Sequence, residues 1–271
     1  MNTPPPVAMT IAGSDSGGGA GIEMDLKVFA ALGVFGTCAL TALTAQNTTG
    51  VRGAWEVPPG FVRDQIAAVL DDLPVKAAKT GMLSSAAVVQ VVASLAREPG
   101  FPPLVVDPVV VAKDGTHLLS DDGIAAVRDH LLPLAAIATP NIPEAEVLSG
   151  LSIESEEDVP RAAAKLRDLG CTWVLVKGGH LRGPEVVDLL LGPEGEQALI
   201  SPRIPGGPFH GTGCALSAAI AAFLAHGRPI PEAVREASSF LQQLLRGALA
   251  LGTGALVLHP QPSAAPEEYQ L

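Results

Sequence analysis

A glycine-rich turn that leads directly into an apolar segment carries the strongest chemical signal in this chain. Residues 210–214 read His-Gly-Thr-Gly-Cys, and residues 215–223 are apolar and rich in alanine. The first N–H groups of a helix have no partner within the helix and lie at the positive end of its dipole, so they suit a phosphate. Cys214 would lie in the first turn, where the thiolate is favoured. The turn predicts a phosphate cradle beside a base; the alternative is a flexible turn with a buried Cys214.

A second glycine-rich segment, residues 13–21, follows the first predicted strand. Five of its nine residues are glycines, and it matches neither G-x-G-x-x-G nor G-x-x-x-x-G-K-[ST]. Glycines let a backbone approach a ligand closely, so this segment is a candidate ligand loop, with a mobile turn as the alternative. Asp25 follows in a predicted helix and would be a surface residue unless it faces a ligand.

Polar residues also stand at the ends of the other predicted strands. Ligands of open parallel sheets bind beyond the carboxyl ends of the strands, so these residues are candidates for a site. Each has a structural alternative: Asp107 can end a strand, and Lys177 can be a surface lysine before a turn. Asn141 and Glu144 have the spacing of a helix capping box. The polar candidates are Gln46, Asn47, Asp107, Asn141, Glu144 and Lys177, and the apolar Met82, which follows the third predicted strand, is a candidate by the same position.

Short apolar runs alternate with helical patterns along most of the chain. Such runs are typical of buried parallel strands. The alternation predicts an α/β fold with a central, mostly parallel sheet that helices cover on both faces. The predicted strands are 8–12, 37–43, 75–79, 104–107, 136–139 and 173–177.

The pattern changes after residue 177. Strand-like runs at 186–191 and 197–201 flank the turn Gly-Pro-Glu-Gly and predict a hairpin. Two helices are expected next, at 211–225 and 231–249, before a proline-rich tail. We find no internal repeat and no long linker, so residues 1–271 are expected to form a single domain, with poor order at 1–6 and 260–271.

The composition points to a small-molecule partner. With 271 residues, 48% of them hydrophobic, the chain can build a substantial core. A net charge of -11 argues against general binding to nucleic acid or to an anionic membrane. Because only 17 residues are Lys or Arg, a phosphate site must rely on backbone N–H groups, a few side chains such as Lys113 and Lys177, and a metal.

The cysteines and the apolar runs suggest a cytoplasmic protein. The three cysteines, Cys38, Cys171 and Cys214, are far apart and form no C-x-x-C pair, which argues against a disulfide framework and against a zinc site. The first ten residues lack the pattern of a secretory signal. The longest apolar run, 215–225, is shorter than the about 20 residues of a membrane-spanning helix.

Several motifs occur in one order along nearly the whole chain. They are Thr10-Ile11-Ala12-Gly13-Ser14-Asp15, Gly18-Gly19-Ala20-Gly21-Ile22, Asp25-Leu26-Lys27, Thr44-Ala45-Gln46-Asn47-Thr48, Lys79-Thr80-Gly81-Met82-Leu83, Asp107-Pro108-Val109, Thr139-Pro140-Asn141, Lys177-Gly178-Gly179-His180 and His210-Gly211-Thr212-Gly213-Cys214. In this order they resemble the hydroxymethylpyrimidine/phosphomethylpyrimidine kinases of thiamine biosynthesis, members of the ribokinase-like superfamily. Many motifs in the right order are more specific than any one of them.

The resemblance implies a reaction, an architecture and an assembly. The γ-phosphoryl group of ATP would pass to the hydroxymethyl oxygen of 4-amino-5-hydroxymethyl-2-methylpyrimidine, and a second transfer onto the monophosphate would give the diphosphate. The fold would be a ribokinase-like sheet of about eight or nine strands between helices. The assembly would be a homodimer.

The resemblance also implies roles for individual residues. Cys214 would act as the base, while the N–H groups of Gly211 to Cys214, Gly213 among them, stabilise charge on the transferred phosphoryl group. The residues implied at the pyrimidine are Gly13, Asp25, Gln46, Met82 and Val109.

A further group of residues would bind the nucleotide and its metal ion. Asn141, Lys177 and Thr212 would contact ATP, with Lys177 on phosphate oxygens. Glu144 and Asp107 would hold Mg²⁺, in part through water, because Mg²⁺ keeps several of its waters.

Two departures and three alternatives accompany the resemblance. Glu23-Met24 stands where relatives often carry Gln-Ala, and Thr253 lies in a Gly-x-Gly segment where a basic residue is frequent.

Pyridoxine or pyridoxal kinase activity is the nearest alternative, since that substrate is also a methylated heterocycle with a hydroxymethyl group. A catalytically silent, ligand-binding relative is the second. A nicotinamide oxidoreductase is disfavoured because G-x-G-x-x-G is absent after the first strand.

Overall fold

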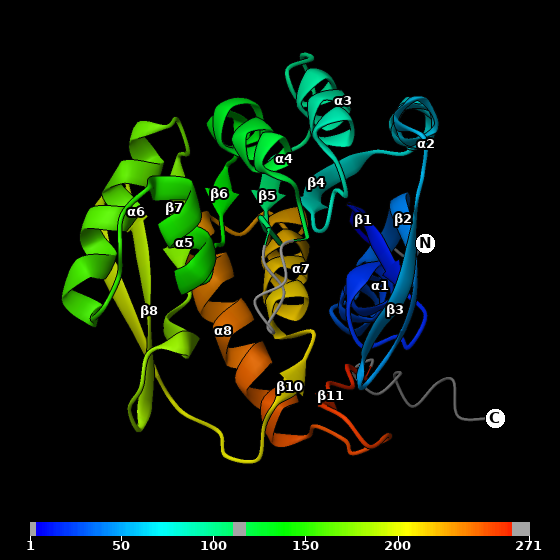
Figure 1. Ribbon diagram of the computed structural model, residues 1–271. Helices are drawn as coiled ribbons and strands as arrows, with labels where there is room; N and C mark the ends of the chain where they lie inside the picture. Colours follow the sequence, from blue (N-terminus) through cyan, green and yellow to red (C-terminus); the bar gives the residue numbers. More distant parts are fainter. Residues whose placement is uncertain (1–3, 111–117, 262–271) are drawn as a thin grey trace.

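A computed structural model describes residues 4–110 and 118–261 of the chain (Figure 1). Nine strands form one sheet in the order β3-β2-β1-β4-β5-β6-β7-β8-β9, and β10 pairs with β11 separately. The strands are β1 (Val7–Asp15), β2 (Phe35–Asn47), β3 (Gly50–Glu56), β4 (Val75–Thr80), β5 (Leu104–Val106), β6 (Ile137–Ala138), β7 (Trp173–Val176), β8 (Glu185–Gly192), β9 (Gly195–Pro202), β10 (Phe209–His210) and β11 (Leu256–Val257).

The helices lie between the strands in the predicted alternation. The α-helices are α1 (Gly21–Ala31), α2 (Pro59–Asp72), α3 (Ala86–Ala96), α4 (Asp121–Ala126), α5 (Ile142–Ser149), α6 (Val159–Asp168), α7 (Thr212–Ala225) and α8 (Ile230–Arg246). A π-helical turn, Val127–Leu131, follows α4 directly, and short 3-10 turns occur at Leu132–Leu134, Glu156–Asp158 and Gly178–His180.

The middle of the large sheet is parallel and its two edges are antiparallel. β1 pairs in parallel with β2 and β4, and parallel pairing continues through β5 and β6 to β7. β3 joins β2 antiparallel at one edge, and the β8–β9 hairpin joins β7 antiparallel at the other (Figure 1). The predicted mostly parallel sheet and the hairpin turn at Gly192 and Gly195 are therefore confirmed.

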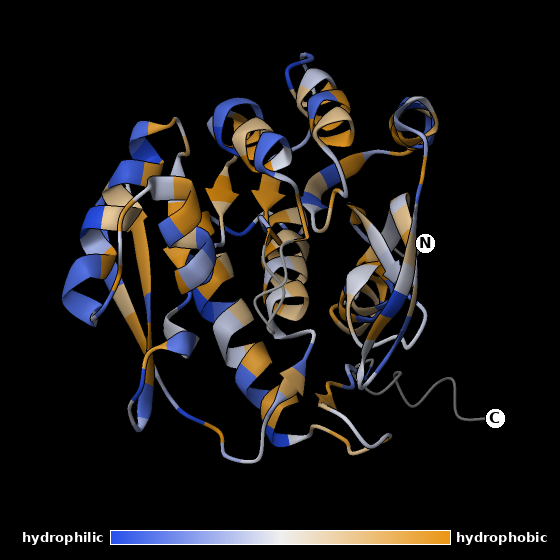
Figure 2. Ribbon diagram, viewed as in Figure 1, coloured by the Kyte–Doolittle hydropathy of each residue, from blue (hydrophilic) through white to orange (hydrophobic). Residues whose placement is uncertain are grey.

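Alternate residues of the short central strands face two separate cores. In β5, Leu104 and Val106 pack in one hydrophobic cluster with helices α2 to α6, whereas Val105 packs in a second cluster with α1, α7 and α8. Side chains of a strand point alternately to its two faces, so an all-apolar strand serves both cores. In Figure 2 the central strands β5 and β6 have the orange of hydrophobic residues.

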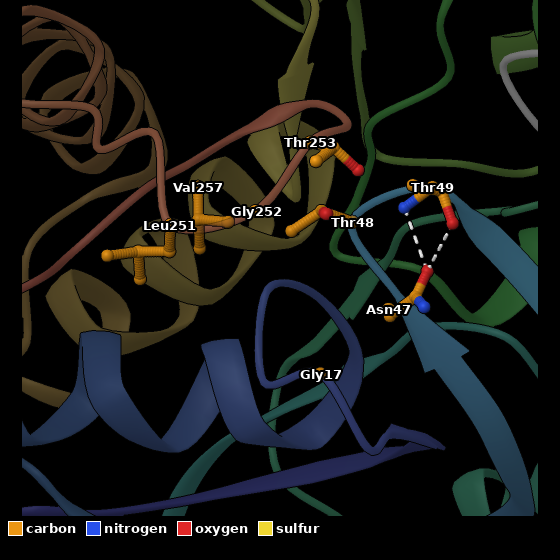
Figure 3. A pocket seen from close by; sticks show the side chains of 8 residues that line it. All are labelled: Gly17, Asn47, Thr48, Thr49, Leu251, Gly252, Thr253 and Val257. Atoms are coloured by element: carbon orange, nitrogen blue, oxygen red, sulfur yellow. Dashed lines mark hydrogen bonds between the residues drawn. The ribbon is translucent and has the colours of Figure 1, made fainter.

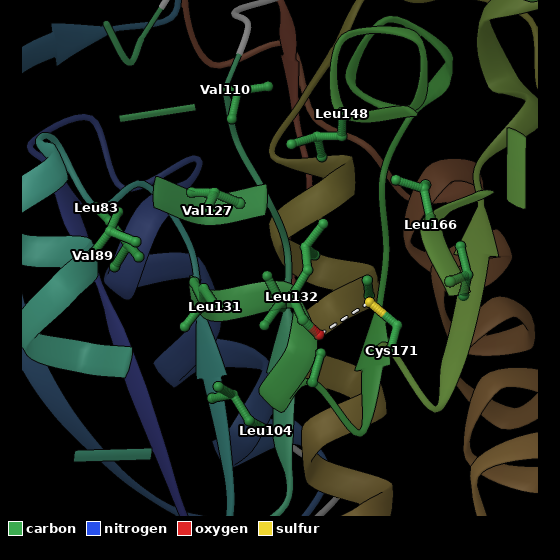
Figure 4. Close-up of a cluster of buried hydrophobic side chains, with 14 of the residues drawn as sticks. Leu83, Val89, Leu104, Val110, Val127, Leu131, Leu132, Leu148, Leu166 and Cys171 are labelled. Atoms are coloured by element: carbon green, nitrogen blue, oxygen red, sulfur yellow. Dashed lines mark hydrogen bonds between the residues drawn. The ribbon is translucent and has the colours of Figure 1, made fainter. Parts of the chain in front are cut away.

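The first of these clusters contains Cys171. Figure 4 shows the side chains of this cluster, with the Cys171 thiol donating to the carbonyl oxygen of Leu132 at 3.1 Å. Burial raises the pKa of Cys171 to about 12, so this residue is a protonated, structural thiol.

Some features differ from the sequence-based expectation. β3 was not predicted because all seven of its residues are exposed, so the strand shows no apolar alternation. Helix α8 ends at Arg246 rather than near 249. The expected poor order of the chain ends falls largely on residues 1–3 and 262–271, which are not described here, while Pro260 is buried. Within residues 4–110 and 118–261, no helix has both the length and the hydrophobicity needed to cross a membrane.

Candidate active site

The entrance to α7 has the backbone geometry of the predicted cradle. Gly211 precedes the helix at φ +79°, in the left-handed region, and no side chain of the described residues caps the helix there. A Cβ atom on Gly211 would lie 1.9 Å from the carbonyl oxygen of Gly19, so a side chain at this position would displace the backbone of the first glycine-rich loop. The two glycine-rich segments of the sequence therefore meet at this point.

An ion pair between the partly buried Lys177 and the buried Asp107 borders the cradle. Lys177 Nζ lies 2.9 Å from Asp107 Oδ1, and Thr139 and Ser217 each donate a hydroxyl hydrogen bond of 3.2 Å to the same carboxylate. A Cβ atom on Gly213 would be 3.3 Å from Lys177 Nζ, so the ammonium lies against the first turn of α7. Burial would raise the pKa of Asp107, but the charges of Lys177 and Lys79, together with the hydrogen bonds from Lys177 and Ser217, outweigh this effect and hold the pKa below its ordinary value. An anion at the cradle would therefore meet a charged ammonium group.

Asn141 and Glu144 form the capping box of α5, as their spacing predicts. The side chain of Asn141 accepts from the Glu144 backbone N–H at 3.0 Å, and Glu144 Oε2 accepts from the Asn141 N–H at 2.8 Å. The backbones of Asn141 and Lys177 form an isolated parallel bridge. The capping box therefore stands next to the ion pair.

Glu144 is expected to make the stability of the protein depend on pH. Burial raises the pKa of its carboxyl from 4.5 to about 7. The folded state then binds a proton that the unfolded state has lost, so stability falls as the pH rises between these two values. Between these pH values the free energy of unfolding should fall by on the order of 3 kcal/mol. We expect Glu144→Gln to remove this fall and to keep the capping box. Urea unfolding of both proteins at about pH 5 and about pH 8 measures this; the same pH dependence in both would contradict it.

The predicted low pKa of Cys214 is wrong for this conformation. Cys214 lies in the first turn of α7 and is partly exposed, but loss of hydration raises the pKa of its thiol to about 11. Lys79 acts in the opposite direction and favours the thiolate, and the backbone N–H of Gly21 donates to the sulfur. Desolvation therefore outweighs the effect expected at a helix N-terminus.

Asp25 lies in the core and not at an open surface. Its Oδ2 lies 2.8 Å from Lys79 Nζ and accepts from Thr10 Oγ1 at 2.6 Å, and the side chains of the ion pair are fully buried. Burial would lower the pKa of Lys79, but the charge and hydrogen bond of Asp25, together with the charges of Cys214 and Asp107, outweigh this effect and raise the pKa, so the lysine is an ammonium group. Asp25 Oδ1 is buried with no hydrogen-bond partner among the described residues.

Lys79 is a residue that sequence reasoning missed. It stands in β4, where the four residues from Ala77 to Thr80 are all buried. A charged side chain within a buried strand needs a partner of opposite charge. Lys79, a charged residue within a predicted apolar strand, was therefore the available signal, and its partner is Asp25, from an earlier motif of the chain.

Two predicted substrate residues, Gly13 and Met82, are in direct contact. The Gly13 N–H donates to the Met82 carbonyl oxygen at 3.1 Å, and Thr41 Oγ1 donates to the same oxygen at 2.6 Å. A Cβ atom on Gly13 would lie 2.5 Å from Met82 Cε. The glycine therefore lets the methionine side chain lie over the end of β1.

Gln46 belongs to a polar network that reaches the cradle. Gln46 Nε2 lies 3.2 Å from His210 Nε2, and Gln46 Oε1 lies 3.1 Å from Thr44 Oγ1. His210 Nε2 is also 2.8 Å from Asp15 Oδ2. The sequence motifs contain Asp15 and His210, but no spacing rule connects residues so far apart in the chain, so their pairing was missed.

Val109 has an unusual backbone conformation. Its φ is +41°, which a β-branched residue rarely adopts. It follows Asp107 by two residues and is half-buried. Strained backbone of this kind persists where the surrounding structure enforces it and is frequent at ligand sites. Lys113, the other basic residue singled out from the sequence, lies outside the described residues.

The late Gly252-Thr253-Gly254 segment packs against the turn between β2 and β3. The Ala255 N–H donates to the Thr48 carbonyl oxygen at 2.9 Å. A pocket of about 480 Å³ opens between this segment, the turn and Gly17 (Figure 3). In the turn, Asn47 Oδ1 accepts from the N–H and the hydroxyl of Thr49 at 2.9 and 2.6 Å, so Asn47 stabilises its own loop.

The carboxylates near the cradle fit an indirectly held Mg²⁺ ion. Asp107 and Glu144 are near enough for the charge of Asp107 to raise the pKa of Glu144. The Glu144 carboxylate already accepts from the N–H groups of Asn141 and Val110. Among the described residues, no three His, Cys, Asp or Glu side chains are grouped so as to hold an ion by themselves. Such a set suits an ion held mainly by water and phosphate oxygens.

Comparison with known proteins accords with this geometry. A family model described as phosphomethylpyrimidine kinase matches residues 15–259, from the end of β1 past β11. The chain belongs to the phosphomethylpyrimidine kinase family. A hydroxymethylpyrimidine/phosphomethylpyrimidine kinase of Streptomyces coelicolor is 48% identical over 250 residues, which are 92% of this chain and 92% of that one.

Two further relatives extend the comparison. The thiamine biosynthesis bifunctional protein ThiED of Geobacter sulfurreducens is 48% identical over 246 residues, which are 91% of this chain and 50% of that protein. The structure of the pyridoxal kinase from Staphylococcus aureus in complex with ADP has a TM-score of 0.88 at 33% identity and covers 94% of both chains. The α/β, ribokinase-like fold implied by the resemblance is therefore confirmed, and the family is one of kinases.

Proposed function

We propose that this protein transfers the γ-phosphoryl group of ATP to the hydroxymethyl oxygen of 4-amino-5-hydroxymethyl-2-methylpyrimidine, and then phosphorylates the monophosphate to the diphosphate in thiamine biosynthesis. One observation carries the proposal. A helix entrance without a side-chain cap, the ion pair of Lys177 with the buried Asp107, and Cys214 meet at one end of the sheet. Membership of the phosphomethylpyrimidine kinase family supports it over most of the chain.

The cradle and Cys214 would carry the transfer step. The N–H groups of Gly211, Thr212 and Gly213 would stabilise charge on the phosphoryl group as it passes to the alcohol. The Cys214 thiolate would accept the proton of the attacking hydroxyl group. With a thiol pKa of about 11, only a minor fraction of Cys214 is thiolate near neutral pH, but this thiolate is strongly basic. The buried Lys79 ammonium favours it.

The pyrimidine would lie against the first glycine-rich loop. Gly13 and Met82 would pack against the ring, and Gln46 offers both a donor and an acceptor to its polar edge. Val109 would border the same pocket from the loop after β5. Asp25 would lie beneath the pyrimidine pocket, where its buried Oδ1 has no hydrogen-bond partner among the described residues.

The nucleotide would bind on the other side of the cradle. Lys177, Thr212 and Asn141 would contact the phosphates, and Lys177 Nζ would move part of its hydrogen bonding from Asp107 to phosphate oxygens. Glu144 and Asp107 would hold the waters of a Mg²⁺ ion. When bound, the ion neutralises charge on the phosphates.

A substrate comparison tests this function. The purified protein is given ATP, Mg²⁺ and one alcohol at a time: the pyrimidine, its monophosphate, or pyridoxine. Release of ADP and the mass of the product are followed. We expect turnover of the pyrimidine and its monophosphate. Turnover of pyridoxine alone would favour the pyridoxal kinase alternative, which the similarity to the Staphylococcus aureus enzyme motivates. No turnover of any alcohol would favour a silent, ligand-binding relative.

We further propose a homodimer that forms through the β2–β3 edge. Trp55 of β3 is 76% exposed and pairs in register with the exposed Leu43 of β2, and Val51 is exposed on the same strand. An exposed edge strand with large apolar side chains is a site for pairing with another chain.

Three cysteines without disulfides support a cytoplasmic location.

Trp55→Glu is expected to shift this dimer to monomer. A carboxylate on the apolar ribbon cannot be buried against a second copy without a charge partner, whereas Trp55 is exposed in the single chain, so folding is retained. Sedimentation velocity measures both proteins at several concentrations. A wild-type protein that stays monomeric, or a variant that dimerises as well as wild type, would contradict the proposal.

A further inference from the structure

One imidazole nitrogen connects the phosphate cradle with the proposed pyrimidine pocket. His210 directly precedes Gly211, and its Nε2 lies 2.8 Å from Asp15 Oδ2 and 3.2 Å from an amide atom of Gln46. A Cβ atom on Gly19 would lie 2.4 Å from His210 Cδ2. The glycine loop therefore closes over the ring and keeps the imidazole in this position.

Asp15 determines where the imidazole proton lies. Its carboxylate accepts from the N–H groups of Gly17, Gly19 and Ala20 at 2.8, 3.1 and 2.9 Å. Burial would raise the pKa of Asp15, but the hydrogen bonds from His210 and from the loop outweigh it and hold the pKa below its ordinary value. An ionised carboxylate only accepts, so His210 Nε2 carries a proton and donates it to Asp15.

This proton in turn determines the orientation of the Gln46 amide. An amide NH₂ group at 3.2 Å from His210 Nε2–H would set donor against donor, whereas the amide oxygen can share that proton. The other end of the amide agrees, because Thr44 Oγ1 donates its proton to the Ser14 carbonyl oxygen at 2.8 Å and is left as an acceptor. The structure places the amide nitrogen of Gln46 at His210 and the amide oxygen at Thr44. Exchanging the two amide atoms, so that the oxygen faces His210 and the nitrogen faces Thr44, satisfies the donors and acceptors at both ends.

We propose that His210 is a specificity-determining residue, which holds the Gln46 amide in one orientation and thereby selects a ring with its donor and acceptor in one order. This rests on the proposed role of Gln46 at the pyrimidine. A 4-aminopyrimidine presents an exocyclic N–H donor beside a ring-nitrogen acceptor. The 4-oxo analogue presents a carbonyl acceptor beside a ring N–H donor, which is the reverse order. Binding of that analogue needs a half-turn of the amide, and His210 together with Thr44 opposes it.

The test compares kcat/KM for the two rings, both with the 5-hydroxymethyl group. Wild type is expected to prefer the 4-amino ring, and His210→Ala is expected to lower this preference about tenfold or more, because the amide is then free to turn. His210→Gln keeps a side-chain N–H donor and should restore much of the preference. Thr44→Val removes the acceptor at the other end of the amide and should lower the same ratio.

The ratio separates specificity from a structural role. A residue that only supports the fold lowers kcat/KM for both rings by the same factor and leaves the ratio unchanged. His226→Ala, at the far end of α7, is the matched control and should keep the wild-type ratio. If wild type phosphorylates neither ring, the proposed function fails. If wild type is active and selective while His210→Ala and Thr44→Val keep its ratio, the role of His210 is overturned.

Discussion

Replacing Cys214 by alanine is expected to lower kcat about 100-fold or more, because removal of a positioned base costs this much in phosphoryl and acyl transfer alike. Binding of ATP and of the pyrimidine should be retained, since the cradle uses backbone N–H groups and the ring contacts come from other residues. Steady-state kinetics give the first quantity, and isothermal titration calorimetry gives the second. Undiminished turnover by Cys214→Ala would show that the thiol is not the base.

The pKa of Cys214 determines in which direction the activity changes with pH. Because the pKa of the Cys214 thiol is raised to about 11, the thiol is protonated near neutral pH, and the thiolate fraction grows about tenfold for each pH unit below that value. Wild-type kcat/KM should therefore rise between about pH 7 and about pH 9, and the residual activity of Cys214→Ala should lack this rise. Cys38→Ala, which removes another partly exposed thiol, on β2, is the matched control.

Lys79→Met is expected to destabilise the protein by about 3 to 5 kcal/mol, because it leaves the buried carboxylate of Asp25 without its counter-charge. Both side chains of the pair are fully buried, and the distance between their charged atoms is 2.8 Å. The change should be measured as the free energy of unfolding in urea at neutral pH. Lys76→Met, three residues earlier on β4 and exposed, should change this energy by no more than about 0.5 kcal/mol.

A double variant distinguishes the lost charge partner from lost packing. Lys79→Met combined with Asp25→Leu removes both charges, and replacement of a buried pair by apolar residues is often close to neutral. We therefore expect the double variant to be more stable than Lys79→Met alone. If the two changes instead add, the pair is not coupled and the cost of Lys79→Met has another source.

The architecture followed from the sequence wherever burial imposed a pattern. The strand Leu104–Val106 is apolar throughout because each face of the sheet carries its own core, and this pattern identified β5 and its neighbours. β3 was missed for the opposite reason: none of its side chains is buried, so nothing in its sequence had to alternate. The single-domain expectation stays a prediction.

The site was predictable where chemistry lies within one short motif. The turn around Gly211 and the capping box of Asn141 and Glu144 are local features, and the structure has both. Asp15 pairs with His210, and Asp25 pairs with Lys79, because the fold brings together elements that are far apart in the chain. The sequence therefore contains these residues but does not indicate their contacts. The pKa of Cys214 could not be predicted from helix position alone, because it depends on desolvation by the whole surrounding fold.

A structure of the complex with the pyrimidine and a non-hydrolysable ATP analogue tests the central claim most directly. The proposed mechanism predicts the terminal phosphoryl group on the N–H groups from Gly211 to Cys214, and the hydroxymethyl oxygen within hydrogen-bonding distance of the Cys214 sulfur. A complex in which the phosphoryl group lies at the α7 entrance, but the sulfur is turned away from the hydroxymethyl oxygen, would contradict it.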